Sequence, residues 1–295
     1  MHAHSLAPRP ADGLLGVAGR LYAASFKRCL PLALIGTLLS TAAGAYASAR
    51  VGALSSRAGA LLNIDLNAPD RLMEAFGDLI ERAHVLVRSP GVWASYLGAA
   101  LVVLAFHGAL IARQDAVAHE RPDSLPGALS GALRRLPSIL LVLAIIAVAA
   151  AVAVLVLRIA SAGGLAVLTL FGLAVTWAAI WLWGRLQLWL VTMFTENLDA
   201  VGALRRSWSL VRGHWLRASA LTTVPYLIIF ALSSLASLGA GAAGGWLRGD
   251  TTAAPVLETL ISLLSGALTL PMLPAVWLAL YRQLLSAGQS ARSGV

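Results

Sequence analysis

Six long runs of apolar residues divide this chain. A helix that crosses the hydrocarbon core of a bilayer needs roughly 20 mostly apolar residues, and each run has about that length. The apolar residues lie in blocks and do not alternate with polar ones, as they would in a strand with one wet face. We therefore expect an all-α integral membrane protein with six transmembrane helices, at residues 29–47, 92–111, 136–157, 165–183, 221–241 and 256–280. The first run is expected to be retained as a span and not cleaved as a signal peptide, because a long segment precedes it.

A short basic segment comes before each odd-numbered span. Ser124 and Asp199 are typical N-caps, and Pro126 suits a first helical turn. Each segment has one apolar face: Leu14, Val17, Leu21 and Ser25 in the first, Leu129, Ala132 and Leu133 in the second, and Val201, Leu204, Trp208 and Val211 in the third. The pattern predicts helices near residues 13–27, 125–135 and 200–213. They would lie in the headgroup layer, apolar face toward the acyl chains and arginines toward phosphate.

Two of these segments share a short repeat. Residues 131–135 and 202–206 both read Gly-Ala-Leu-Arg-Arg. Because the two copies precede equivalent spans, they favour three pseudo-repeated units, each a basic interfacial helix followed by a transmembrane hairpin. The chain, 1–295, is then expected to be a single polytopic membrane domain.

A further amphipathic helix is predicted near residues 69–87, between the first two spans. Asn67, Pro69 and Asp70 are typical of a helix start. Apolar side chains recur on one side and acidic ones on the other: Leu72, Phe76, Leu79, Ile80, Ala83 and Val87 against Asp70, Glu74, Asp78 and Glu81. We expect a periplasmic helix packed on the bundle or on the outer leaflet. A docking surface for a partner is the alternative.

Composition and charge define the compartment. The 295 residues are 59% hydrophobic and 12% charged, whereas soluble domains carry roughly 25% charged residues. With the N-terminus in the cytoplasm, the cytoplasmic segments hold 15 basic and six acidic residues and account for the whole net charge of +9. Positively charged loops stay in the cytoplasm, which predicts a bacterial inner-membrane protein with both termini inside. The charge then indicates anionic phospholipid partners, not nucleic acid.

The region of the fourth and fifth spans carries a distinctive pattern. Arg185 and Glu196 come before a basic helix, and the last span ends in Tyr281-Arg282. The helix reads Ala203-Leu204-Arg205-Arg206-Ser207-Trp208-Ser209-Leu210-Val211-Arg212-Gly213-His214-Trp215-Leu216-Arg217. This pattern resembles uncharacterised six-helix bacterial membrane proteins related to the glycerophosphoryl diester phosphodiesterase membrane-domain family, although Leu190 stands where those proteins commonly have a proline. The resemblance implies fold and location. It implies no phosphodiesterase activity, because that activity belongs to a separate soluble domain.

Glu196 and the arginines after it are the main candidates for a binding site. A carboxylate near the inner interface can pair with one guanidinium while the others bind lipid phosphate, for which arginine offers planar, bidentate donors. The candidate phosphate-binding residues are Arg205, Arg206, Arg212 and Arg217. The alternative is structural: an ion pair between Glu196 and Arg185 would fix the corner, with Trp208 and Trp215 as interfacial anchors. Gly213 is expected to allow the turn into the fifth span.

Several residues within the spans have two interpretations. His107 and Glu258 mark a functional site or snorkel toward the interface, and their positions near span ends favour the second. Pro271 and Pro274 indicate either a kink in the last span or a broken helix that lines a transport path. Small residues spaced by four favour close packing or self-association: Gly36, Ser40 and Gly44, and Ser233, Ser237 and Gly241. The sequence leaves open whether residues 186–194 extend the fourth span or turn along the surface.

The sequence has no recognisable catalytic or cofactor motif. Its six histidines lack metal-ligand spacing, and it has neither a phosphate-binding glycine loop nor a nucleophile elbow. Cys29 is the single cysteine, so an intrachain disulfide is excluded. We therefore expect a non-enzymatic protein without metal or cofactor that binds or organises lipids, or contributes to envelope homeostasis. The alternatives are a transporter or channel for a small or amphipathic solute, a scaffold or accessory subunit for a membrane-protein partner, and a lipid enzyme.

Overall fold

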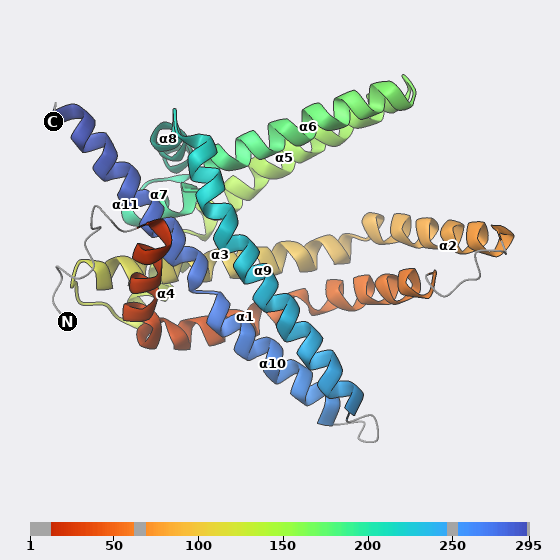
Figure 1. The fold of residues 1–295 in the computed structure, drawn as a ribbon, viewed down its shortest axis with the longest axis horizontal. Helices are drawn as coiled ribbons and strands as arrows, with labels where there is room; N and C mark the ends of the chain where they lie inside the picture. Colours follow the sequence, from red (N-terminus) through yellow and green to blue (C-terminus); the bar gives the residue numbers. More distant parts are fainter. Residues whose placement is uncertain (1–12, 62–68, 247–252, 294–295) are drawn as a thin grey trace. The chain divides into compact units, whose positions relative to one another are not determined.

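The computed structural model describes residues 13–61, 69–246 and 253–293, which form eleven α-helices and no strand (Figure 1). The helices are α1 (Leu14–Leu61), α2 (Pro69–Arg88), α3 (Pro90–Ala118), α4 (Leu125–Arg134), α5 (Leu136–Ser161), α6 (Leu165–Leu186), α7 (Trp189–Thr195), α8 (Ala200–Val211), α9 (Trp215–Trp246), α10 (Ala253–Thr269) and α11 (Met272–Ser293). Within these ranges, six helical stretches are long and apolar enough to cross a bilayer: Leu14–Gly52, Pro90–Ala118, Leu136–Ser161, Ala166–Thr195, Ala218–Ala236 and Thr259–Ala287. The chain is an all-α polytopic membrane protein, as predicted.

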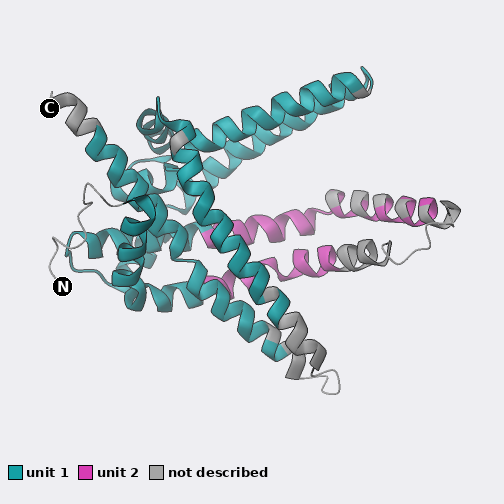
Figure 2. Cartoon of the chain, in the orientation of Figure 1, with its two compact units in different colours: residues 1–35, 104–295 teal, residues 36–103 magenta. Residues whose placement is uncertain are grey.

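The chain divides into two compact units (Figure 2). The smaller unit, residues 36–103, contains the second part of α1, all of α2 and the first part of α3. The larger unit, residues 1–35 and 104–295, contains the remaining helices and all the predicted phosphate-binding arginines.

Small residues hold α1 and α3 together in the smaller unit. The Ser95 hydroxyl donates to the Ala43 carbonyl at 2.6 Å and accepts from the Ala47 amide at 3.2 Å. A Cβ on Gly44 would lie 3.5 Å from the Ala99 Cβ, which is ordinary contact. Gly44 belongs to the predicted small-residue pattern, and here that pattern serves close helix packing.

The predicted amphipathic helix near residues 69–87 is confirmed as a helix, α2. Its acidic residues Glu74, Asp78 and Glu81 are exposed, and Asp78 forms an ion pair with Arg82 at 2.7 Å. This pair raises the pKa of the Arg82 guanidinium. Most of the predicted apolar stripe lies outside the described side chains: Leu72, Phe76, Ile80, Ala83 and Val87. The location of α2 on the periplasmic side stays a prediction.

The first turns of α1 pack inside the larger unit. The four residues of their predicted apolar face do share one side of the helix, since all four are buried: Leu14, Val17, Leu21 and Ser25. The predicted position of this face on the acyl chains is wrong, because protein covers it: residues 275–281 of α11 lie in the same core. Pro31 lies inside α1 and cannot donate to the Lys27 carbonyl. In Figure 1 the first, red turns of α1 accordingly run at a steep angle to the turns that follow.

Two helical hairpins follow, α5 with α6 and α9 with α10. Gly164 makes the turn between α5 and α6 with a φ of 87°, a conformation that favours glycine. Exposed apolar side chains such as Val148, Leu155 and Leu170 cover the first hairpin, as lipid contact requires. The helix of the fourth span is interrupted after Leu186, where α6 ends, and the short α7 that follows has Leu190, Val191 and Met193 buried in the protein.

The predicted last span, 256–280, is broken into α10 and α11. Pro271 lies in the break and Pro274 in the first turn of α11, so both remove backbone donors there. Side chains from other helices bond two carbonyls beside the break: the Tyr22 hydroxyl donates to the Leu268 carbonyl and Gln114 Nε2 to the Pro271 carbonyl, each at 2.9 Å. The Pro271 carbonyl also accepts from the Ala275 amide at 3.3 Å. The break is larger than the kink that the sequence favoured, and α1 and α3 contribute hydrogen bonds to it.

Candidate functional site

The corner between α7 and α8 positions the residues that the sequence singled out. The predicted N-cap is confirmed: the Asp199 carboxylate accepts from the Gly202 amide at 3.0 Å. Asn197, just before it, has a φ of 58°, a conformation that asparagine tolerates better than most residues. Gly213 makes the expected turn into α9 with a φ of 86°. These two turns place α8 between two spans, with one end tied to each.

The face of α8 that packs on the protein consists of Ala200, Ala203, Ser207 and Val211. The predicted apolar face, Val201, Leu204, Trp208 and Val211, was expected on the acyl chains, and of its residues only Val211 is buried in the protein. Two hydrogen bonds explain the difference: Thr192 Oγ1 donates to the Ala203 carbonyl at 3.1 Å, and Ser207 Oγ donates to the Arg185 carbonyl at 2.9 Å. Such backbone contacts need small side chains between the helices, so the larger apolar residues are displaced outward.

Glu196 is the centre of a polar network that joins three helices. Arg206 Nε lies 2.8 and 2.9 Å from the two carboxylate oxygens of Glu196. The Tyr281 hydroxyl donates to Glu196 Oε1 at 2.7 Å. Glu196 follows α7, Arg206 belongs to α8 and Tyr281 to α11, so one carboxylate ties these three elements together.

The alternative ion pair between Glu196 and Arg185 is not formed. The Arg185 guanidinium instead lies over two indole rings, 5.2 Å from the centre of Trp181 and 4.8 Å from that of Trp208. Cation–π contact of this kind stabilises an arginine by about 0.5–2 kcal/mol, more where water is excluded. Arg206 is placed closer to the carboxylate by the α7–α8 crossing, and it occupies both oxygens.

Arg135 reinforces the same corner from the start of α5. Its guanidinium donates to the Asn197 side-chain oxygen and lies 4.9 Å from the centre of the Phe194 ring. Burial lowers the pKa of Arg135, although an arginine stays protonated in proteins. Phe194 in turn covers Gly108 of α3, where a Cβ would overlap the ring.

Two of the predicted phosphate-binding arginines face solvent. Arg205 and Arg212 are exposed, and within the described part of the chain neither guanidinium has a hydrogen-bond, ion-pair or ring partner. Arg206 is committed to Glu196. The side chain of Arg217 lies outside the described ones. Trp208 and Trp215 pack edge-on against Trp181 and Trp177 of α6, with ring centres 5.0 and 6.1 Å apart.

A cluster of ion pairs at the end of α3 was not predicted. Asp123 binds Arg113 at 2.7 Å and Arg28 at 3.1 Å, while Asp115 binds Arg121 and also His119 at 3.1 Å. The signal in the sequence was the alternation of charge in Arg113-Gln114-Asp115 and Arg121-Pro122-Asp123. These pairs fold the loop between α3 and α4 back onto the helix.

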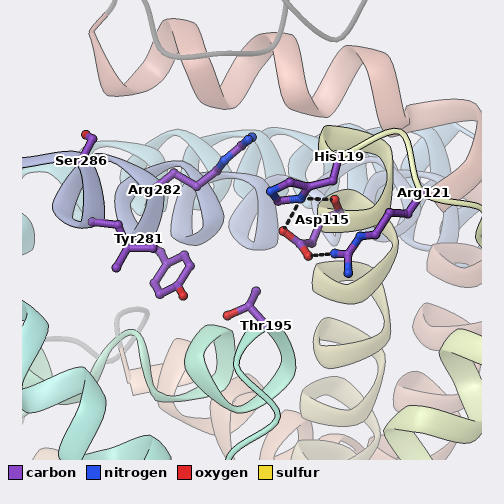
Figure 3. Close-up of a pocket in the computed structure, with 8 residues that line it drawn as sticks. Asp115, His119, Arg121, Thr195, Tyr281, Arg282 and Ser286 are labelled. Atoms are coloured by element: carbon purple, nitrogen blue, oxygen red, sulfur yellow. Dashed lines mark hydrogen bonds and ion pairs between the residues drawn. The ribbon is translucent and has the colours of Figure 1, made fainter. Parts of the chain in front are cut away.

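A cavity of about 600 Å³ lies between this loop and α11 (Figure 3). Its lining comes from the end of α3, the loop after it, the end of α7 and the middle of α11: Asp115, His119, Arg121, Thr195, Tyr281, Arg282, Leu285 and Ser286. Tyr281 therefore belongs both to the Glu196 network and to the cavity wall. Of these residues, the resemblance had pointed only to Tyr281 and Arg282.

Two buried glutamines were also missed. Gln114 donates to the Pro271 carbonyl between α10 and α11, and Gln187 accepts a 2.7 Å hydrogen bond from Thr222 Oγ1 of α9. The signal was a recurring pair near the end of each hairpin: Arg113 with Gln114, Arg185 with Gln187, and Arg282 with Gln283. The recurrence fits the predicted three-unit pseudo-repeat.

The interior candidates do not form a site among the described residues. His107 is 5% exposed, and its ring centre lies 5.5 Å from that of Trp277, so it packs within the protein. The Glu258 side chain lies outside the described ones. No group of three or more histidine, cysteine or acidic side chains in the described ranges is arranged to hold a metal ion.

Comparison of this chain with protein-family models, curated proteins and solved structures found no match. The family resemblance therefore stays a prediction, and the function is argued from the site.

Proposed function

We propose that this chain is a multi-pass protein of the bacterial inner membrane that binds anionic phospholipids at its cytoplasmic surface and has no enzymatic activity. Both termini are placed in the cytoplasm because the basic excess falls on that side. The observation that carries the proposal is the unequal use of the arginines in α8 and at its C-cap. Arg206 is neutralised by Glu196, whereas Arg205 and Arg212 are exposed and unpartnered among the described residues.

The position of α8 supports lipid phosphate as the ligand. The helix lies between the fourth and fifth candidate spans, so both of its ends are held at one membrane surface. A guanidinium near an anionic surface contributes about 1 kcal/mol to binding, and its planar donors match phosphate oxygens. Arg134 of α4 is a third exposed arginine of this kind. Together, Arg134, Arg205 and Arg212 define what we term the basic elbow surface.

The tryptophans beside α8 also favour a position at the level of the lipid headgroups. The indole pairs Trp181–Trp208 and Trp177–Trp215 join α6 to α8 and to the start of α9. Indole rings concentrate where hydrocarbon meets headgroups. Arginines on the outer side of such a helix would therefore face lipid phosphate.

The transporter alternative draws no support from the broken last span. A transport site at a broken helix uses free backbone carbonyls and helix ends to hold its solute. Here the Leu268 and Pro271 carbonyls already accept from Tyr22 and Gln114. These two contacts favour a packing role for the break.

Lipid titration by native mass spectrometry tests the proposal. Wild-type protein and the Arg205→Gln/Arg212→Gln variant would be titrated with phosphatidylglycerol in neutral detergent. The matched control is Arg88→Gln/Arg158→Gln, which removes two exposed arginines from the last turns of α2 and α5. All three proteins should elute as one species.

We expect the α8 variant to lose about 2 kcal/mol of binding free energy, or about 30-fold in affinity, from two arginines at about 1 kcal/mol each. The control variant should bind as wild type does. Equal affinity of the wild type and the α8 variant, or an equal loss in both variants, would contradict the proposal.

A further inference from the structure

The cavity beside α11 is a second site, built from residues that the basic elbow surface does not use. Its volume of about 600 Å³ lies within the roughly 300–1,000 Å³ typical of small-molecule sites. Its wall comes from α3 and the following loop, from α7 and from α11, which are all parts of the larger unit. Such a hollow can hold a small ligand against several helices at once.

The charges in this cavity do not balance. It contains two guanidinium groups, Arg121 and Arg282, but one carboxylate, Asp115. Asp115 is already engaged by Arg121 and by His119. Within the described part of the chain, the Arg282 guanidinium has no hydrogen-bond, ion-pair or ring partner. Figure 3 shows Arg282 extending toward His119, on the side of the cavity where Asp115 and Arg121 are paired. A partly enclosed arginine without a counter-ion favours an anionic ligand.

The walls are fixed without a ligand. The Arg121 amide donates to the Ala116 carbonyl at 2.9 Å, and Asp123 ties the loop to Arg113 at 2.7 Å. On the opposite side Tyr281 is held by Glu196. Arg121, held by Asp115, is therefore ordered before a ligand binds, which lowers the side-chain entropy lost on binding.

We propose that this cavity binds a phosphate group, with Arg282 as its principal donor and Arg121 as a second cation. Arg121 and Arg282 together exceed Asp115 by one positive charge, which suits an anion, and the planar donors of a guanidinium match phosphate oxygens in pairs. The hydroxyls of Thr195 and Ser286 line the same space, and Leu285 offers an apolar contact to whatever the phosphate carries. The phosphate can come from a lipid headgroup or from a soluble phosphomonoester.

The test uses the full chain in phosphatidylcholine nanodiscs and two kinds of probe. In the first arm, inorganic phosphate and glycerol 3-phosphate are titrated by calorimetry. In the second arm, nanodiscs are prepared with phosphatidic acid, and the lipid retained per protein is measured by native mass spectrometry. Arg282→Gln is the main variant, and Arg158→Gln is the matched control because it removes an exposed arginine from the end of α5.

We expect wild type to bind a probe in at least one arm. The affinity of Arg282→Gln for that probe should be lower by a factor of about ten or more, and Arg158→Gln should bind it as wild type does. Binding in the first arm identifies a soluble source, and binding in the second arm alone identifies a lipid. No binding in either arm, or equal binding by wild type and Arg282→Gln, overturns the proposal.

Arg121→Gln keeps the question decidable if Arg282→Gln does not fold. The Arg121 side chain is 59% exposed, so the fold tolerates its replacement better. Arg121→Gln should lower the affinity for the same probe severalfold, and an unchanged affinity would count against the proposed site. The Arg205→Gln/Arg212→Gln variant should bind the soluble probes as wild type does. Failure of this site and failure of the basic elbow surface are therefore separate results.

Discussion

Tyr281 donates a 2.7 Å hydrogen bond to Glu196, although the two residues lie 85 positions apart in the chain. The bond links α11 to the corner between α7 and α8, where Arg206 holds both oxygens of the same carboxylate. Glu196 thus accepts three hydrogen bonds from two helices. The carboxylate that the sequence marked as a switch or anchor serves in the structure as a joint between helices.

Replacing Tyr281 by phenylalanine tests this joint. A hydrogen bond to a charged group contributes about 1.5–3 kcal/mol, and the partial exposure of Glu196 places the expected loss near the lower figure. Thermal unfolding in detergent, followed by circular dichroism, should show a lower midpoint for Tyr281→Phe. Tyr96→Phe is the control, because Tyr96 is exposed in the smaller unit. Equal midpoints for both variants would show that the bond contributes nothing.

Gly108 and Gly131 predict opposite effects of the same substitution. A Cβ on Gly108 would overlap the Phe194 ring, which Arg135 holds in place, whereas nothing lies within 4 Å of a Cβ on Gly131 in α4. Gly108→Ala should destabilise the protein by about 1–3 kcal/mol through overpacking. Gly131→Ala should stabilise it by up to about 1 kcal/mol through helix propensity. Unfolding midpoints measured side by side decide the matter, and a stabilising Gly108→Ala would refute the packing described here.

Gln114→Leu should destabilise the segment around the break between α10 and α11. The change keeps the size of a fully buried side chain but leaves the Pro271 carbonyl without its side-chain donor. The Pro271 carbonyl still accepts from the Ala275 amide at 3.3 Å, so the expected loss is that of one hydrogen bond, about 0.5–1.5 kcal/mol. Hydrogen exchange followed by mass spectrometry should show faster exchange in residues 266–276, together with a lower unfolding midpoint. Unchanged exchange there would mean that the break does not depend on α3.

Cysteine labelling tests the proposed orientation. Cys29 is fully buried, and a Cys29→Ser background removes it altogether. Ser130 in α4 and Ser161 at the end of α5 are both exposed and lie at opposite ends of the third span. In intact cells a membrane-impermeant maleimide should label Ser161→Cys, and it should reach Ser130→Cys only after lysis. The reverse pattern would place the basic helices outside and contradict the charge argument.

The fold was predictable where a single helix carries its own signal. The six apolar runs, the caps at Ser124 and Asp199 and the turn at Gly213 were all legible, since each depends on residues close together in sequence. The last span was only partly predicted. Its prolines indicated a disturbance, but the size of the break depends on Tyr22 and Gln114, which come from distant parts of the chain.

The site was harder to predict because contact between helices decided it. The choice of Arg206 over Arg185 as the partner of Glu196 follows from how α7 crosses α8, and that crossing depends on Ala203 and Ser207. Apolar periodicity marks the largest side chains and therefore pointed to Trp208. Close packing between membrane helices selects the smallest ones. The cavity was invisible for the same reason, since its walls come from three separated segments.

The two side chains that donate to carbonyls at the break in the last span, Tyr22 and Gln114, are synthesised before that span. Tyr22 precedes Leu268 by 246 positions, and Gln114 precedes Pro271 by 157. Both donors are therefore already made and inserted when α10 and α11 emerge from the ribosome. Helices α10 and α11 would meet both side-chain donors on arrival, whereas the same two helices expressed alone would enter the bilayer without these two hydrogen bonds. The N-terminal half of the chain thus acts as an internal template for its last helix.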